Sequence, residues 1–223
     1  MNKLPQLKKI RPLTDNQQLT FDAWERGNNL VLAGSAGTGK TFLGLYLALK
    51  DVFDGNTPYT KVIVVRSVVP TRDMGFLPGD EQEKKDAYTR PYIGITAELF
   101  GRSDAWLGLQ VSEKVQFEST SFIRGLTWDD AIIVVDEMQN LNFHELDSVI
   151  TRVGENTKLI LCGDYYQSDF HWDTDKKGIS KFIKIMKMLD RFKVIEFTWE
   201  DIVRSDLVKD YIMVKEQMKI KGV

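Results

Sequence analysis

The strongest chemical signal in the sequence is the segment GSAGTGKT at residues 34–41, which matches the pattern G-x-x-x-x-G-K-[ST]. The apolar run LVLA precedes it and the helical pattern FLGLYLALK follows it, which is the context that a phosphate-binding loop requires. Its glycines let backbone N–H groups close around an anion. We predict that Lys40 neutralises the β and γ phosphates of a nucleotide and that the Thr41 hydroxyl ligates Mg²⁺. The predicted nucleotide-binding residues of this loop are Gly34, Ser35, Ala36, Gly37, Thr38, Gly39, Lys40 and Thr41.

Two adjacent acids, Asp136 and Glu137, follow a second apolar run at residues 131–135. We expect Asp136 to hold Mg²⁺ through the water shell of the metal, and Glu137 to orient or deprotonate the attacking water. Two acids after a strand also occur in solvated turns. Beside a phosphate-binding loop the functional interpretation is favoured, because phosphoryl transfer requires a metal carboxylate and a water-positioning group in one site.

Two glutamines are candidates for further contacts with the nucleotide. Gln167 ends the segment GDYYQ, which follows an apolar run, and its amide is placed to contact the γ-phosphate; a plain polar loop is the alternative. Gln17 lies in TDNQ, where it fits a helix capping box by returning to the backbone of Thr14. The same amide would suit recognition of the adenine edge, and the two interpretations are compatible. The predicted cofactors are therefore ATP and Mg²⁺.

The elements that position these motifs alternate along the chain. Short apolar runs rich in Val, Ile and Leu are typical of a parallel sheet covered on both faces, and helical patterns separate them. We expect a doubly wound, mainly parallel α/β fold, in which ligands bind at the carboxyl ends of the strands. The predicted strands are 30–33, 62–65, 115–117, 131–135, 159–162 and 194–197. The predicted helices are 40–53, 143–153, 179–189 and 207–218.

The composition limits the class of protein. A chain of 223 residues suffices for one sizeable domain, and 43% hydrophobic and 28% charged residues are typical of a globular fold. A net charge of -2 excludes a strongly basic nucleic-acid coat but permits a local basic channel. The single cysteine, Cys162, excludes an intramolecular disulfide framework and is expected in the core. No secretory signal or membrane-spanning run is found, so we expect a cytoplasmic location without membrane association.

The motifs together resemble the first RecA-like domain of a superfamily 1 helicase. They are Gln17, the loop at 34–41, DEMQ at 136–139 and GDYYQ at 163–167. The segment 66–92 is more specifically similar to the PhoH-like ATPase family. The motifs that carry this similarity are GFLPGD at 75–80, EK at 83–84, IRGLT at 123–127 and FTWEDIVRSDLV at 197–208.

The resemblance covers about residues 14–211, so we expect the whole chain, 1–223, to be a single PhoH-like P-loop ATPase domain. Residues 70–112, which hold three of the six prolines and no clear strand, are expected to be a long family-specific connection. The sequence departs from the usual pattern of the family at two positions, and neither belongs to the phosphate-binding motifs. They are Ser67, where the family usually has a proline, and Ser205, where a histidine is common.

The resemblance implies an ATP-hydrolysing enzyme that acts on RNA or single-stranded nucleic acid, and thus a candidate RNA helicase. Basic residues near the long connection are candidate contacts, although a solvated loop is the alternative because nearby acids dilute the positive potential. The candidates are Arg66, Arg72, Lys84, Lys85, Arg90 and Arg124, with Phe76, Tyr88 and Tyr92 for stacking. An ATP-switched RNA-binding or scaffold protein with little turnover is the alternative function.

Helicases of this superfamily place ATP between two RecA-like domains, and the second domain supplies arginines. Only one such domain is expected here. An arginine finger contributes on the order of 10³ to 10⁵ in turnover, and Arg204 is our candidate, either in cis or lent by an adjacent subunit. A surface arginine paired with Glu200 or Asp201 is the alternative. We therefore predict a homo-oligomer, with a hexameric ring favoured, and a specific activity that depends on protein concentration.

Overall fold

A computed structural model of the protein describes residues 6–67, 81–164 and 173–220. Its centre is a six-stranded sheet in which every neighbouring pair of strands is parallel. The strands are β1 Asn29–Gly34, β2 Lys61–Arg66, β3 Val115–Ser119, β4 Ala131–Val135, β5 Lys158–Gly163 and β6 Phe192–Phe197. They follow the order β3-β2-β4-β5-β1-β6 across the sheet. All six predicted strands and the parallel α/β fold are confirmed.

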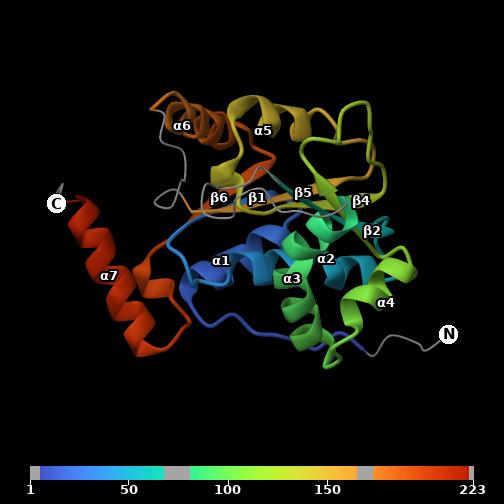
Figure 1. Ribbon diagram of the computed structural model, residues 1–223, viewed down its shortest axis with the longest axis horizontal. Coiled ribbons are helices and arrows are strands. Elements are labelled where there is room, and N and C mark those ends of the chain that lie inside the picture. Colours follow the sequence, from blue (N-terminus) through green and yellow to red (C-terminus); the bar gives the residue numbers. More distant parts are fainter. Residues whose placement is uncertain (1–5, 68–80, 165–172, 221–223) are drawn as a thin grey trace.

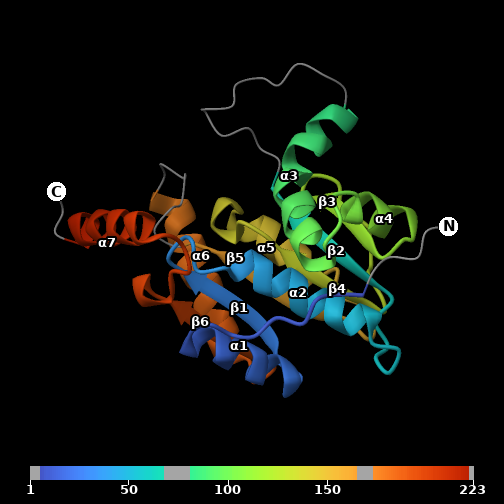
Figure 2. The same cartoon turned by 90° about the horizontal axis from the view of Figure 1, so that it is seen from below.

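Helices cover both faces of this sheet (Figures 1 and 2). The α-helices are α1 Asp15–Glu25, α2 Lys40–Phe53, α3 Glu81–Phe100, α4 Ala105–Val111, α5 Phe143–Ile150, α6 Asp173–Met188 and α7 Asp206–Ile220. Two short 3-10 helices, η2 Met138–Asn140 and η4 Trp199–Asp201, follow β4 and β6. The four predicted helices are confirmed as α2, α5, α6 and α7, and the bounds of α2 agree at both ends.

The central strands are apolar along their whole length because both faces of the sheet are buried. On one face, α1 to α4 pack over Leu30, Leu32, Val62, Val64 and Ile160. On the other face, α5 and α6 pack over alternate residues of the same strands. The thiol of Cys162 is buried, as expected, and its Sγ lies 3.6 Å from the carbonyl oxygen of Lys40.

The long connection expected at residues 70–112 contains two helices that the sequence does not predict, α3 and α4. One face of α3 is buried at Tyr88, Tyr92, Thr96 and Leu99, which is a helical spacing. The hydrophobic pattern of the sequence does not indicate this helix, because its buried face carries tyrosine and threonine and because Pro91 lies inside it. Likewise the sequence indicates α1 only through its cap, since the buried face of this helix includes two polar side chains.

The sheet brings the chemically interesting segments to one edge. Strands β4, β5 and β1 are adjacent, and their carboxyl ends carry the acids, the GDYYQ segment and the glycine-rich loop. Close approach of β1 to β6 requires glycine at residue 34, because a methyl group there would lie 1.9 Å from the carbonyl oxygen of Phe197. No helix within the described ranges is both long and apolar enough to cross a membrane.

Candidate nucleotide-binding site

The glycine-rich loop leaves β1 and enters α2, and three of its glycines adopt a left-handed backbone conformation. Gly34, Gly37 and Gly39 have φ angles of +121°, +76° and +83°, which L side chains rarely adopt. Gly39 is also the N-cap of α2, so the free N–H groups of the helix face the loop. The hydroxyl of Ser35 is buried and has no hydrogen-bond partner among the described residues. These donors fit an anionic phosphate.

Lys40 already fills the centre of this loop. Its ammonium donates to the carbonyl oxygens of Gly34 at 2.9 Å and Ser35 at 2.6 Å, and lies 3.4 Å from the Thr38 hydroxyl. Burial lowers the pKa of Lys40, although nearby carboxylates oppose this shift. A bound phosphate would therefore replace the loop carbonyls as the partner of a cation that is already positioned.

Thr41 and Asp136 come from different strands and meet at hydrogen-bond distance. The Thr41 hydroxyl donates to Oδ1 of Asp136 at 2.7 Å, although β5 lies between their strands in the sheet. A hydroxyl and a carboxylate are hard oxygen ligands of the kind that Mg²⁺ binds, usually while it keeps several waters. The two residues predicted to hold the metal are thus brought together beside the phosphate loop, and their chemistry fits Mg²⁺.

The second oxygen of Asp136 contacts a residue that the sequence does not assign to this site. Tyr92 of α3 is fully buried, and its hydroxyl donates to Oδ2 of Asp136 at 2.9 Å. Burial, and then the negative charge of Asp136, raise the pKa of Tyr92 well above its ordinary value. The buried spacing of Tyr88 and Tyr92 on α3 is the signal that could have indicated this placement.

Arg66, predicted to contact nucleic acid, ends β2 close to the two acids. Burial acts to lower its pKa, but Tyr92, Asp136 and Glu137 outweigh burial and raise it. Its guanidinium carbon lies 5.9 Å from the centre of the Tyr88 ring. Arg66 is half-buried, and it lies beside Asp136, one of the two predicted metal ligands.

Glu137 is held by a short polar network. Its backbone is left-handed, with a φ of +53°, which turns the chain from β4 into η2. The side-chain amide of Gln139 donates to Oε2 of Glu137 and, through Oε1, accepts from the backbone N–H of Asp164 at 2.9 Å. Burial, and then Asp136, raise the pKa of Glu137. Gln139 belongs to the DEMQ motif, but the sequence alone assigns it no role.

Gln17 contacts the phosphate loop directly. Its amide nitrogen donates to the carbonyl oxygen of Thr38 at 3.2 Å, and its amide oxygen accepts from Leu13 N–H at 2.9 Å. The capping interaction differs from the expectation, because the side chain returns to Leu13 and not to Thr14. The Thr14 hydroxyl does accept from Gln17 N–H at 3.3 Å. Adenine recognition by Gln17 stays a prediction.

Arg204 lies against the phosphate loop of its own chain. The backbone N–H of Val203 donates to the carbonyl oxygen of Gly37 at 3.2 Å, and a methyl group on Gly37 would lie 3.2 Å from Cγ of Arg204. Asp201, one proposed alternative partner, instead accepts from Asn16 at 2.7 Å and from Thr198 N–H at 2.9 Å. Within the described part of the chain, Arg204 forms no ion pair.

The model of the PhoH-like protein family matches residues 9–216. This chain belongs to the PhoH-like protein family. A PhoH-like protein of Bacillus subtilis (strain 168) is 32% identical over 206 residues, covering 92% of this chain and 63% of that protein. Protein PhoH of Escherichia coli (strain K12) is 31% identical, covering 80% of this chain and 50% of that protein.

The PhoH-like chain therefore spans about half to three fifths of the length of these curated relatives. Among solved structures, the large terminase from a thermophilic bacteriophage has a TM-score of 0.51 and 13% identity. The match covers 90% of this chain and 50% of the terminase chain. At that identity the likeness concerns the fold alone, and it agrees with the parallel P-loop architecture described above.

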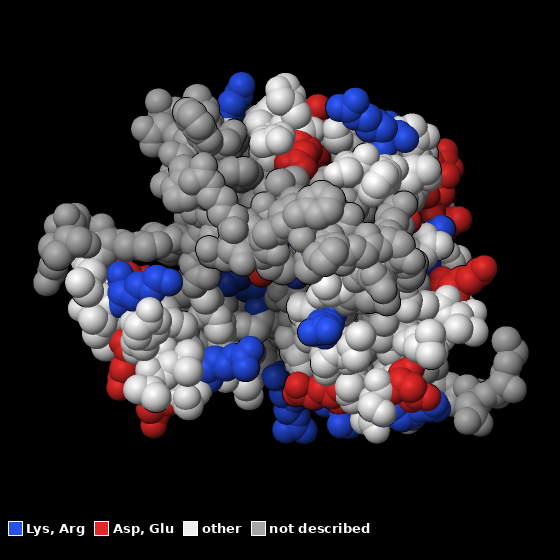
Figure 3. All heavy atoms as spheres, viewed as in Figure 1, with Lys and Arg blue, Asp and Glu red and all other residues white. Residues whose placement is uncertain are grey.

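Some predicted residues of this PhoH-like chain lie outside the described structure. They are Gln167 and Arg72, together with the side chains of Lys84 and Lys85 in α3. Arg90 and Arg124 are exposed. Figure 3 shows basic and acidic side chains interspersed on one face of the molecule. The contacts of these basic residues with nucleic acid stay predictions. Base stacking by Tyr92 is contradicted, because this side chain is fully buried.

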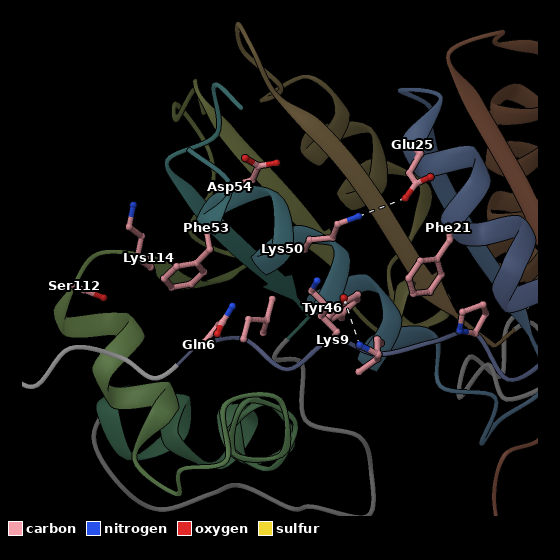
Figure 4. A pocket seen from close by; sticks show the side chains of 13 residues that line it. Gln6, Lys9, Phe21, Glu25, Tyr46, Lys50, Phe53, Asp54, Ser112 and Lys114 are labelled. Carbon is pink, nitrogen blue, oxygen red and sulfur yellow. Dashed lines mark hydrogen bonds and ion pairs between the residues drawn. The ribbon is translucent and has the colours of Figure 1, made fainter. Parts of the chain in front are cut away.

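A pocket lies away from the phosphate loop, between the N-terminal segment, α1 and α2 (Figure 4). Aromatic rings of Phe21, Tyr46 and Phe53 line it, and an ion pair of 3.4 Å joins Lys50 to Glu25 at its margin. None of the predicted nucleotide-site residues lines this pocket. Tyr46 is therefore a buried tyrosine that lines this pocket and not the candidate nucleotide-binding site.

Proposed function

We propose that this PhoH-like chain binds ATP with Mg²⁺ at the carboxyl ends of β1, β4 and β5 and hydrolyses the bond to the γ-phosphate. The observation that carries the proposal is the hydrogen bond of 2.7 Å between Thr41 and Asp136. It joins the phosphate loop to the acidic strand end, so that a metal ligand set and a candidate base, Glu137, share one site. Phosphoryl transfer depends mainly on such positioning and on electrostatic stabilisation.

Each residue of the site has a distinct role in this proposal. Loop N–H groups and Lys40 bind the phosphates, and bound Mg²⁺ would neutralise charge on the β and γ oxygens. Glu137 orients the attacking water, supported by Gln139. Gln167 contacts the γ-phosphate. The placement of Arg204 beside the loop of its own chain supports action in cis.

We further propose that RNA or single-stranded nucleic acid stimulates turnover. The support is the resemblance of segment 66–92 to the family pattern and the exposure of Arg90 and Arg124. These arginines would contact phosphate groups and, with few base contacts, give little sequence preference. Helicase activity belongs to the same proposal.

A homo-oligomer, with a hexameric ring favoured, is also proposed. Its support is α7, which stands out from the body of the molecule in Figures 1 and 2. Four apolar side chains at heptad-like spacing on α7 are 48% to 79% exposed. They are Leu207, Tyr211, Val214 and Met218. Because Arg204 lies two residues before α7, association through this helix would bring a neighbouring chain close to the nucleotide.

The test is phosphate release by the wild-type protein and Glu137→Gln, with and without single-stranded RNA. We expect Glu137→Gln to lower kcat by about 100-fold or more, since a positioned base contributes about 10² to 10⁴. Nucleotide binding should persist, and RNA should raise wild-type turnover. Glu155→Gln, an exposed glutamate before β5, is the matched control and should behave as wild type.

Two outcomes would contradict the proposal. Full turnover by Glu137→Gln would remove the assigned base. Tight nucleotide binding with negligible turnover in wild type, whether or not RNA is present, would instead support the ATP-switched scaffold.

A further inference from the structure

Asp136 is held by two different parts of the molecule. Thr41, at the start of α2, donates to Oδ1 at 2.7 Å, and Tyr92, in the middle of α3, donates to Oδ2 at 2.9 Å. Both oxygens of the proposed metal carboxylate thus have a neutral hydroxyl donor. The orientation of the carboxylate plane therefore depends on α3 as well as on the phosphate loop.

Tyr92 cannot easily move away from this position. Its ring lies 5.6 Å from Trp106 of α4 and 6.0 Å from Phe117 of β3, measured between ring centres. The side chain is fully buried, so its hydroxyl has no access to bulk water as an alternative partner. The phenolic O–H is a hydrogen-bond donor, and in this position it donates to the carboxylate of Asp136.

The same helix has an inner and an outer face near Asp136. Tyr88 and Tyr92 lie on the buried face one turn apart, and the Tyr88 ring is 5.9 Å from the guanidinium carbon of Arg66. Arg90, two residues before Tyr92, is exposed. A ligand bound at the outer face would therefore contact the helix that holds the metal carboxylate.

We propose that Tyr92 is a positioning residue that makes the Mg²⁺ site depend on the placement of α3, so that single-stranded nucleic acid at α3 changes metal affinity through Asp136. The proposal deepens the function proposed above and rests on it for the identity of the ligand. By linkage, bound Mg²⁺–nucleotide and bound nucleic acid then alter the affinity of each other by the same factor. The element that links the two sites is α3, and its contact with the metal carboxylate is the hydrogen bond from Tyr92.

The test compares Tyr92→Phe with Tyr46→Phe in Mg²⁺ titrations of a fluorescent, non-hydrolysable ATP analogue. Tyr46 is the matched control because it is buried, accepts a long 3.5 Å hydrogen bond from Ile10 N–H, and lines the pocket of Figure 4. For Tyr92→Phe we expect the Mg²⁺ midpoint to rise about 10-fold or more, as is usual when a residue supporting a metal ligand is lost. Analogue affinity without Mg²⁺ should not change, and Tyr46→Phe should match wild type.

A second arm adds a single-stranded oligouridylate to the same titration. We expect it to shift the Mg²⁺ midpoint of wild type and Tyr46→Phe but not that of Tyr92→Phe. An Mg²⁺ midpoint of Tyr92→Phe within about twofold of wild type would overturn the positioning role. A lower thermal unfolding temperature of Tyr92→Phe with that unchanged midpoint would show that Tyr92 serves packing alone. Equal shifts by the oligonucleotide in all three proteins, or no shift in wild type, would overturn the coupling.

These readouts separate this inference from the proposed function. The Mg²⁺ midpoint is measured without turnover, so it judges Tyr92 even if the wild-type protein hydrolyses nothing. A protein that hydrolyses ATP but shows the same midpoint in both tyrosine variants would retain the proposed function and lose this inference. Failure of wild type to bind the analogue at all would contradict both.

Discussion

Two neighbouring carboxylates in this site have different surroundings, and the difference supports the roles proposed for them. Asp136 accepts hydrogen bonds from two hydroxyl groups, which orient its carboxylate for the proposed role as a metal ligand. Glu137 accepts from the amide of Gln139, and burial raises its pKa. A raised pKa makes a carboxylate a better proton acceptor near neutral pH. The left-handed backbone of Glu137 directs these adjacent side chains into different environments.

Arg204 is the residue that we propose to stabilise the transition state. Arg204→Ala should lower kcat by roughly 10³-fold while leaving ATP affinity nearly unchanged, because an arginine finger acts mainly on the transition state. Steady-state phosphate release and equilibrium binding together measure this. Arg191→Ala is the control, since Arg191 is exposed and lies at the opposite end of β6.

A mixing experiment tests whether Arg204 acts in cis. Its stem packs against Gly37 of the same chain, so a mixture of Arg204→Ala and Glu137→Gln should stay inactive. Recovery of activity on mixing would show that the arginine is lent between subunits and would contradict this assignment.

Among the elements, the strands are predictable because burial on both faces imposes continuous apolar runs. The helix α2 is predictable at both ends, since the phosphate-loop motif fixes its start. Helices α1 and α3 are not predicted as helices. Their buried faces carry Gln17, Thr20, Tyr92 and Thr96, whose polar groups find partners in the fold that no local pattern reveals.

A cluster of polar and aromatic contacts joins β5 to α1 and α2 at the opposite end of the sheet. The ammonium of Lys158 lies 3.2 Å from the centre of the Trp24 ring and donates to the Trp24 carbonyl oxygen at 3.1 Å. The Trp24 indole N–H donates to Asp51 at 2.9 Å. Burial lowers the pKa of Lys158 to about 8, although Asp51 opposes the shift.

This lowered pKa predicts a pH-dependent contribution to stability. Between about pH 8 and the ordinary lysine pKa of 10.5, the unfolded chain holds a proton that the folded chain has lost. The contribution of Lys158 to the free energy of unfolding should therefore rise with pH across that window. Urea unfolding of wild type and Lys158→Met at about pH 7 and about pH 10 measures it, and the difference between the two proteins should change.

Lys193→Met is the control for this comparison, because Lys193 is an exposed lysine of β6. Its difference from wild type should be the same at both pH values. Parallel behaviour of Lys158→Met and wild type would contradict the assigned burial.

For the whole molecule, the sheet order explains how distant segments form one site. Thr41 and Asp136 are 95 positions apart in the chain, yet both follow strands that end at the same edge. The sequence predicts this pairing because phosphate loops and acidic strand ends recur together in known chemistry. It does not predict Tyr92, Arg66 or Gln139 as part of the site, since their contacts depend on how α3 and η2 pack against the sheet.

We propose that the glycine-rich loop and the acidic strand end form one site for ATP and Mg²⁺. The most direct measurement is the gain in ATP affinity on adding Mg²⁺, determined by calorimetry for wild type, Thr41→Val, Asp136→Asn and the double variant. If both residues serve one metal, each single change should remove most of the gain and the double change should remove little more. Additive losses of this gain in the double variant, or a wild-type ATP affinity that Mg²⁺ does not change, would contradict a shared metal site.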